Sequence, residues 1–112
     1  MPPFNVVPTL GYLRQSAQLE KRYRSWAAEA DALAESLKTA PDQGVGLGRG
    51  CRKIRVAIAS KNKGKSGGAR VITLVRLVGE VVVLLAVYDK SDRADLAPGE
   101  LDALLAAAGL GA

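Results

Sequence analysis

The chain has 112 residues, of which 48% are hydrophobic and 24% charged, and this balance predicts one domain over residues 1–112 and excludes a disordered chain. A single cysteine excludes an internal disulfide, and the absence of histidine excludes a His-based acid–base pair, a Ser-His-Asp triad and a His-ligated metal site. No secretory signal is visible, and the longest apolar run is far shorter than the roughly 20 residues of a membrane helix, so we expect a cytoplasmic protein without membrane contact.

The N-terminal part of the chain predicts a short strand followed by helix. Residues 4–7 have strand character. Residues 12–40 contain neither glycine nor proline, and their apolar residues recur at spacings of three and four. This stripe allows one long helix. Ser25 is however a candidate N-cap with Glu29 in the following turn, so we favour a helical hairpin that breaks near residues 23–25.

The second half predicts strands and a final helix. A linker rich in glycine, residues 41–50, cannot continue the helix. The first strand alternates apolar and basic residues, whereas the other two are apolar almost throughout, as expected for central strands. The predicted strands cover residues 51–59, 69–78 and 81–88, and the helix opens at residues 96–100. We therefore expect an α+β fold, β-α-α-β-β-β-α, with the N-terminal strand and the helical hairpin packed on a small antiparallel sheet.

Positive charge is concentrated in the middle of the chain. The interval from Gln43 to Gly79 contains nine basic residues and no acidic residue, while the rest of the chain has a net negative charge. Charge of this kind is typical of a surface that binds a polyanion. Long cationic side chains on a flexible loop attract phosphates without selecting a sequence. The predicted RNA-binding residues are Arg52, Lys61, Lys63, Lys65 and Arg76; the alternative is a solvated loop without a ligand.

Three cations are candidates for chemistry at the loop end of these strands. Lys53 and Arg55 share one strand face, and Arg70 begins the next strand, so a hairpin would bring them together. Such cations can stabilise the equatorial oxygens of a phosphoryl group during RNA cleavage, and a lysine whose pKa is lowered by the crowded like charges can accept the 2′-OH proton. They could equally dock an acidic partner. Tyr88, where the last strand ends, can donate a proton or stack on a base, or be a core residue.

The blocks CRKIRVAIASKNKGKSGGARVITLV and VVLLAVYDKSD, with the terminal E-L-x-x-L-L helix, resemble the RelE/ParE superfamily of type II toxin–antitoxin toxins, in its RelE/HigB-like branch. By motif position, Lys53 and Arg55 look like the two basic residues of the strand, Arg70 like the arginine opening the next strand, and Lys90 like the basic residue after the last one. RelE has a further tyrosine where this sequence places Leu96, which leaves Tyr88 as the candidate substitute.

The resemblance implies a compact toxin that a cognate antitoxin holds inactive. When free, it would inhibit translation as an mRNA endoribonuclease, commonly on the ribosome, without a metal ion or a cofactor. The implied catalytic residues are Lys53, Arg55, Arg70, Tyr88 and Lys90. Two alternatives remain: a non-nucleolytic inhibitor of DNA gyrase, as in the ParE branch, or a decayed toxin that only binds its antitoxin.

Overall fold

The computed structural model describes residues 3–62 and 64–110. In chain order the elements are β1 (Asn5–Pro8), α1 (Leu10–Arg22), α2 (Trp26–Leu37), β2 (Val45–Gly48), β3 (Cys51–Val56), β4 (Ala69–Arg76), β5 (Val81–Asp89) and α3 (Glu100–Ala107). Two short 3₁₀ turns, Ala59–Lys61 and Lys65–Gly67, lie in the loop between β3 and β4. Within this described part of the chain, no helix has both the length and the apolar character needed to cross a membrane.

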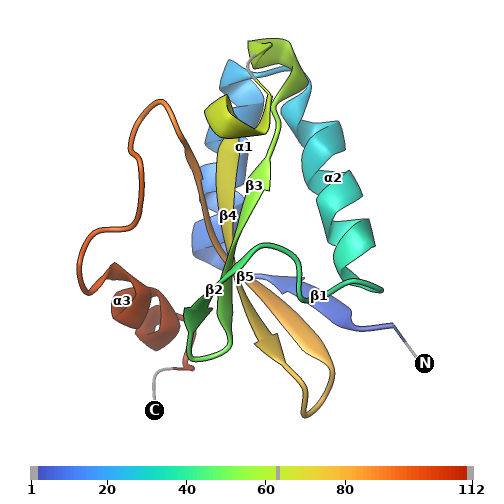
Figure 1. Ribbon diagram of the computed structural model, residues 1–112, viewed down its shortest axis with the longest axis vertical. Coiled ribbons are helices and arrows are strands. Elements are labelled where there is room, and N and C mark those ends of the chain that lie inside the picture. The colour runs from blue at the N-terminus through green and yellow to red at the C-terminus, as the bar shows by residue number, and fades with distance from the viewer. Residues whose placement is uncertain (1–2, 63, 111–112) are drawn as a thin grey trace.

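The strands form one mixed sheet in the order β1-β5-β4-β3-β2 (Figure 1). Strands β2 to β5 pair antiparallel, but β1 runs parallel to β5. The predicted α+β class is confirmed, whereas a wholly antiparallel sheet is not found. The direction of β1 is set by its pairing with β5, which is distant in the sequence. The residues of β1 alone do not specify that partner.

Strand β2 lies inside the segment expected to be a linker. It pairs with β3. The Arg52 side chain holds the residues just before β2 in place by donating to the carbonyl oxygens of Gln43 (3.0 Å) and Gly44 (2.7 Å). Gly44 has φ +87°, and a Cβ there would lie 2.3 Å from the carbonyl oxygen of Lys53. Glycine is therefore required at position 44 for this close approach. The glycines inside β2 have no side chains, so the sequence of this strand shows no alternation of apolar and polar residues.

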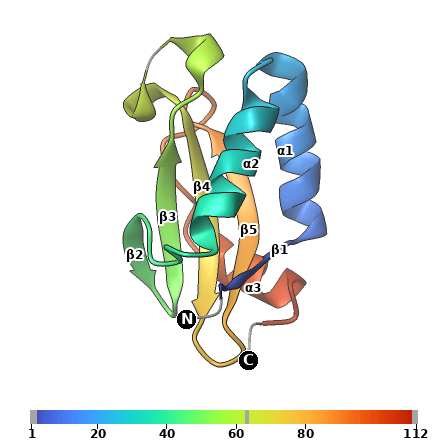
Figure 2. The ribbon, with the colours of Figure 1, turned by 90° about the vertical axis from the view of Figure 1, so that its right-hand side faces the viewer.

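Helices α1 and α2 cover one face of the sheet, and α3 covers the other (Figure 1, Figure 2). The helical hairpin is confirmed, because α1 ends at Arg22 and the extended backbone of Tyr23 separates it from α2. Trp26 is fully buried against the sheet, and its indole N–H donates to the Ser16 hydroxyl at 2.9 Å. Burial of a side chain of this kind anchors the hairpin on the sheet by about 3 kcal/mol.

One extra residue in β5 sets which side chains face which helix. Ile72 pairs with Ala86 and Thr73 pairs with Leu84, so Leu85 has no partner in the register. This is a β-bulge, and it places Leu85 and Ala86 in the core on the α3 face. Beyond the bulge, Tyr88 faces α3.

Candidate functional site

Arg55, Arg70 and Tyr88 lie in one row across β3, β4 and β5, because the register pairs Arg55 with Arg70 and Arg70 with Tyr88. Neighbouring strands are about 4.8 Å apart, so the two arginines leave the sheet side by side. We call these three residues the arginine–tyrosine row. Arg55 is exposed, and it forms no ion pair with a carboxylate in the described ranges.

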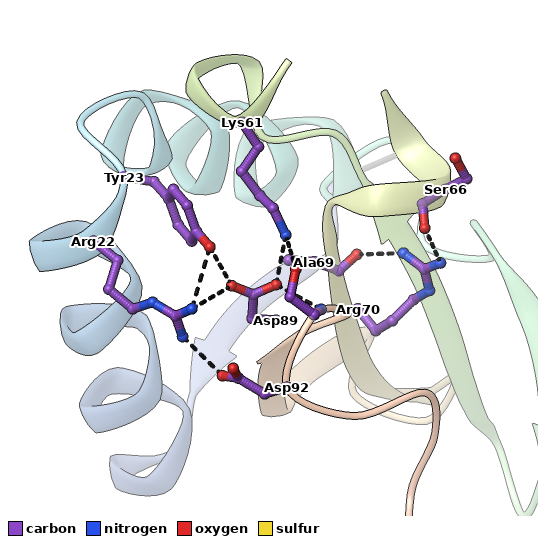
Figure 3. Close-up of polar contacts among 9 residues, drawn as sticks. Arg22, Tyr23, Lys61, Ser66, Ala69, Arg70, Asp89 and Asp92 are labelled. Atoms are coloured by element: carbon purple, nitrogen blue, oxygen red, sulfur yellow. Dashed lines mark hydrogen bonds and ion pairs between the residues drawn. The ribbon is translucent and has the colours of Figure 1, made fainter. Parts of the chain in front are cut away.

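The Arg70 side chain is held at the edge of the loop between β3 and β4. Arg70 is only 3% exposed, and its guanidinium donates to the carbonyl oxygens of Ala69 (3.2 Å) and Ser66 (3.1 Å) (Figure 3). Burial, and after it the positive charge of Arg55, lowers the pKa of Arg70. An anion that contacts both guanidinium groups would offset both effects, so this position favours a phosphate.

Tyr88 is both a core residue and a member of the row. It is 8% exposed, and its hydroxyl has no hydrogen-bond partner among the described residues. Burial raises the pKa of Tyr88, so the neutral phenol is favoured. The Arg93 guanidinium lies over its ring at 4.7 Å from the centroid, and two hydrogen bonds of 2.9 and 2.5 Å join Arg93 to Glu100. Sequence reasoning missed Arg93 and Glu100, because residues 89–95 have only a polar, turn-like composition.

Lys53 lies on the same face but already has an acidic neighbour. Its ammonium is 3.3 Å from Asp95 Oδ1, a carboxylate that lies outside the basic interval in sequence but reaches it in space. A backbone hydrogen bond from Leu96, and then one from Lys53, lowers the pKa of Asp95. Such a partly exposed pair contributes about 0–1 kcal/mol, so a phosphate can displace the carboxylate. Lys53 and Arg55 also line a groove of about 630 Å³ along β2.

Of the predicted RNA-binding residues, those whose side chains the structure describes do not form one surface. Arg52 bonds to backbone carbonyls beside β2. Arg76 is exposed at the far end of β4, six residues or about 20 Å from Arg70. Lys63 lies outside the described residues, as does the side chain of Lys65.

Lys90 and Lys61 differ in their surroundings. Lys90 directly follows β5, and its backbone N–H donates to the Gly68 carbonyl at 3.0 Å. No acidic side chain of the described chain pairs with the Lys90 ammonium. The Lys61 side chain, contrary to expectation, points into the protein.

Lys61 belongs to a cluster around a buried carboxylate that the sequence did not reveal (Figure 3). The Asp89 side chain is fully buried; its Oδ1 accepts from the Lys61 ammonium (2.7 Å) and its Oδ2 from the Tyr23 hydroxyl (2.5 Å). Its Oδ2 also forms an ion pair with the Arg22 guanidinium at 3.2 Å. We call these four residues the Asp89 cluster. Burial alone raises the pKa of Asp89, but the hydrogen bonds from Lys61 and Tyr23 outweigh it and lower the pKa to about 2.

Helix α2 holds the start of the same loop. The Glu29 carboxylate accepts from the backbone N–H of Ala59 at 2.6 Å, and the Ser25 hydroxyl accepts from that of Ser60 at 3.0 Å. Ser25 stands at the N-cap position of α2 as predicted, but its side chain makes no capping hydrogen bond and serves the loop instead.

The end of the loop is fixed by Gly68. A Cβ at this position would lie 2.0 Å from the Val56 carbonyl oxygen, so the chain crosses β3 too closely for any side chain. The loop between β3 and β4 is thus anchored at both ends, and its second 3₁₀ turn supplies the Ser66 carbonyl that holds Arg70.

Among residues 3–62 and 64–110, no three Cys, Asp or Glu side chains gather in a way that could hold a metal ion. The groups in the arginine–tyrosine row, with Lys53 and Lys90 beside it, are cationic or phenolic. This arrangement can bind a phosphodiester and exchange protons with it.

Comparisons with known proteins agree on one family. A family model described as the RelE toxin of the RelE/RelB toxin–antitoxin system matches residues 15–111. The fold is similar to a chain of the toxin–antitoxin complex RelBE2 from Mycobacterium tuberculosis, with a TM-score of 0.58 and 23% identity over 85% of this chain and 97% of that chain. It is also similar to a mutant of E. coli toxin RelE in the free state, with a TM-score of 0.57 and 16% identity over 82% of this chain and 87% of that one. No curated protein matches the chain.

Proposed function

We propose, from the premise that this chain belongs to the RelE family of toxin–antitoxin toxins, that it is an endoribonuclease that cleaves mRNA on the ribosome. The observation that carries the proposal is the arginine–tyrosine row, in which two guanidinium groups and a buried phenol lie side by side. The proposed catalytic residues are Lys53, Arg55, Arg70, Tyr88 and Lys90.

Arg55 and Arg70 would bind the non-bridging oxygens of the scissile phosphate. Phosphoryl transfer places negative charge on these oxygens in the transition state, and guanidinium donors fixed in position stabilise that charge without rearranging. Arg70 suits this role because the carbonyl oxygens of Ser66 in the loop and of Ala69 in β4 hold it in place before any ligand binds. The exposed Arg55 would close on the phosphate from the outer side.

Lys53 and Tyr88 would exchange the protons. In RNA cleavage the 2′-OH attacks phosphorus, a base takes its proton, and the 5′-oxygen leaves with a proton from an acid. Lys53 is the candidate acceptor in its neutral amine form, after phosphate has displaced Asp95 and the ammonium has released a proton to solvent. The phenol of Tyr88 is the candidate donor, since its raised pKa keeps the proton on the hydroxyl until the leaving oxygen develops charge.

A cognate antitoxin would hold the toxin inactive by covering this face. Arg55 and Lys90 have no acidic partner in the described part of the chain, so an acidic segment of the antitoxin would find complementary charge there. The proposed target, mRNA on the ribosome, corresponds to a cytoplasmic site of action.

The test compares Arg55→Ala with Arg76→Ala. Both replace an exposed arginine of the sheet, but Arg76 lies about 20 Å from the row. We expect Arg55→Ala to lower the rate of RNA cleavage by about 10²-fold or more, as for the loss of one transition-state donor, and to relieve growth arrest. Arg76→Ala should do neither. Primer extension on cellular mRNA locates the cuts.

Intact transcripts during growth arrest would refute the nuclease proposal, and a simultaneous loss of DNA supercoiling would favour a gyrase inhibitor. An equal loss of cleavage in Arg76→Ala would show that the row is not the site.

A further inference from the structure

We infer that Lys61 and Asp89 are a positioning pair for the nuclease site: their buried ion pair fixes the loop that holds Arg70, and neither side chain contacts RNA. This inference rests on the proposed function, and it assigns a task to the most buried ion pair of the described residues.

The contacts of Lys61 exclude it from the RNA-binding surface. Its side chain is 5% exposed, and its ammonium donates to Asp89 Oδ1 at 2.7 Å and to the Ser91 hydroxyl at 2.6 Å. The ammonium also lies 5.3 Å from the centroid of the Tyr23 ring. With two of its three donors bonded and an aromatic ring beside it, Lys61 would have to leave the interior to reach a phosphate.

Asp89 lies on the opposite side of the sheet from the substrate. Successive strand residues face opposite sides, so Asp89 faces α1 and α2 while Tyr88 faces α3. The Asp89 carboxylate therefore cannot touch a phosphate bound by Arg55 and Arg70. Its influence on the site must act through the backbone and the loop.

The route to Arg70 is short. Asp89 pairs in the β ladder with Ala69, whose carbonyl oxygen accepts from the Arg70 guanidinium. Lys61 ends the first 3₁₀ turn of the loop, and Ser66 in the second turn supplies the other carbonyl (Figure 3). The ion pair thus joins the loop to β5, the strand next to Arg70. Without this pair, we expect both the loop and the Arg70 guanidinium to become more mobile.

The test replaces Lys61 and Lys90 in turn by methionine in the full chain. The two variants lose the same charge from the same end of the sheet, but Lys61 pairs with Asp89, whereas Lys90 pairs with no acidic side chain that the structure describes. We expect Lys61→Met to slow single-turnover cleavage at least tenfold while leaving the salt dependence of binding to a non-cleavable 2′-O-methyl RNA unchanged. Lys90→Met should lower that salt slope by about 0.7, as for one lost contact to a single-stranded phosphate.

Two outcomes would overturn the inference: wild-type cleavage in Lys61→Met, or a fall in its salt slope equal to that of Lys90→Met. Should Lys61→Met fail to fold, Ser91→Ala takes its place. Ser91 is exposed and its hydroxyl supplies only one of the two bonds to the ammonium, so this change should slow cleavage two- to threefold with an unchanged slope. An unchanged rate in Ser91→Ala would then count against the inference.

A readout without RNA separates this inference from the proposed function. In the ¹⁵N-labelled protein, the restrained Arg70 guanidinium should give separate signals for its terminal nitrogens. Lys61→Met should merge them by freeing the group, and Lys90→Met should not. If the wild-type protein cleaves no RNA, the proposed function fails; if the signals stay separate in Lys61→Met, the positioning role fails whether or not RNA is cleaved.

Discussion

Replacing Asp89 by asparagine tests the energetic weight of the Asp89 cluster. The carboxylate accepts hydrogen bonds from Lys61 and Tyr23 and forms an ion pair with Arg22, whereas the amide of asparagine offers one oxygen and turns a donor toward the remaining cations. The Lys61 ammonium would remain buried without its counter-charge. Removing one member of a buried ion pair costs about 3–5 kcal/mol, against a total stability of roughly 6–17 kcal/mol for a chain of this length. The variant should therefore fold, but with a clearly reduced free energy of unfolding.

The pH dependence of the free energy of unfolding gives a second, independent value for the contribution of the ionised Asp89. The pKa of Asp89 falls from 3.8 to about 2 on folding, and a change of nearly two units corresponds to about 2 kcal/mol. Because the folded-state pKa is the lower one, this stabilisation is complete above pH 3.8 and is lost as the pH falls through 2. Asp89→Asn lacks it, so the difference between variant and wild type should shrink by about 2 kcal/mol between pH 5 and pH 2.

Urea unfolding followed by the fluorescence of the single tryptophan, Trp26, measures both quantities. Asp92→Asn is the matched control, because Asp92 is 58% exposed and pairs only at the surface with Arg22, which predicts a loss below about 1 kcal/mol. A loss of less than 1 kcal/mol in Asp89→Asn at pH 7 would refute the reasoning. So would a loss of the same size at pH 7 and pH 2, since the charge of Asp89 would then not be its cause.

Three further changes test other parts of the structure. Gly68→Ala forces a Cβ against the Val56 carbonyl oxygen at 2.0 Å and should cost about 3 kcal/mol in urea unfolding; full stability would contradict the close crossing. Trp26→Ala empties a fully buried site and should cost about 3–5 kcal/mol, measured by far-ultraviolet circular dichroism; a loss below 1 kcal/mol would contradict its place in the core. Arg93→Ala removes the hydrogen bonds that lower the pKa of Glu100, so it should cost about 1 kcal/mol at pH 7 and less as the pH falls and Glu100 takes up a proton; a loss that does not shrink with falling pH would contradict this.

Periodic patterns predicted the elements that bury a regular face. The break of the helical hairpin, the alternation in β3 and the two apolar strands after it follow from local sequence alone. Strand β2 does not, because its glycines carry no side-chain pattern and its pairing depends on contacts with β3. The parallel course of β1 depends likewise on a partner about 76 residues away along the chain, such as Val81 for Asn5.

The candidate site was predictable only where the chemistry lies on neighbouring strands. Arg55 and Arg70 follow from the expected hairpin, and the register brings them side by side. The count of charges in one interval suggested that Lys61 is an exposed cation, but the acid that neutralises it, Asp89, is 28 residues later in the chain. The charges that are near in the sequence therefore do not show which charges are near in the folded protein. Lys53 is a second example, because its acidic neighbour Asp95 also lies outside that interval.

The bulge at Leu85 determines the electrostatic polarity of the site. If β5 ran as a regular strand with the same sequence, every residue after the bulge would turn to the other side. Tyr88 would then point toward α1 and α2, and the carboxylate of Asp89 would stand beside Arg70 as a permanent competitor for its ligand. The one-residue bulge thus decides whether this face can bind a phosphate or is neutralised by the protein's own Asp89. Relatives of this chain should therefore be aligned across Leu85 by structure before their site residues are compared.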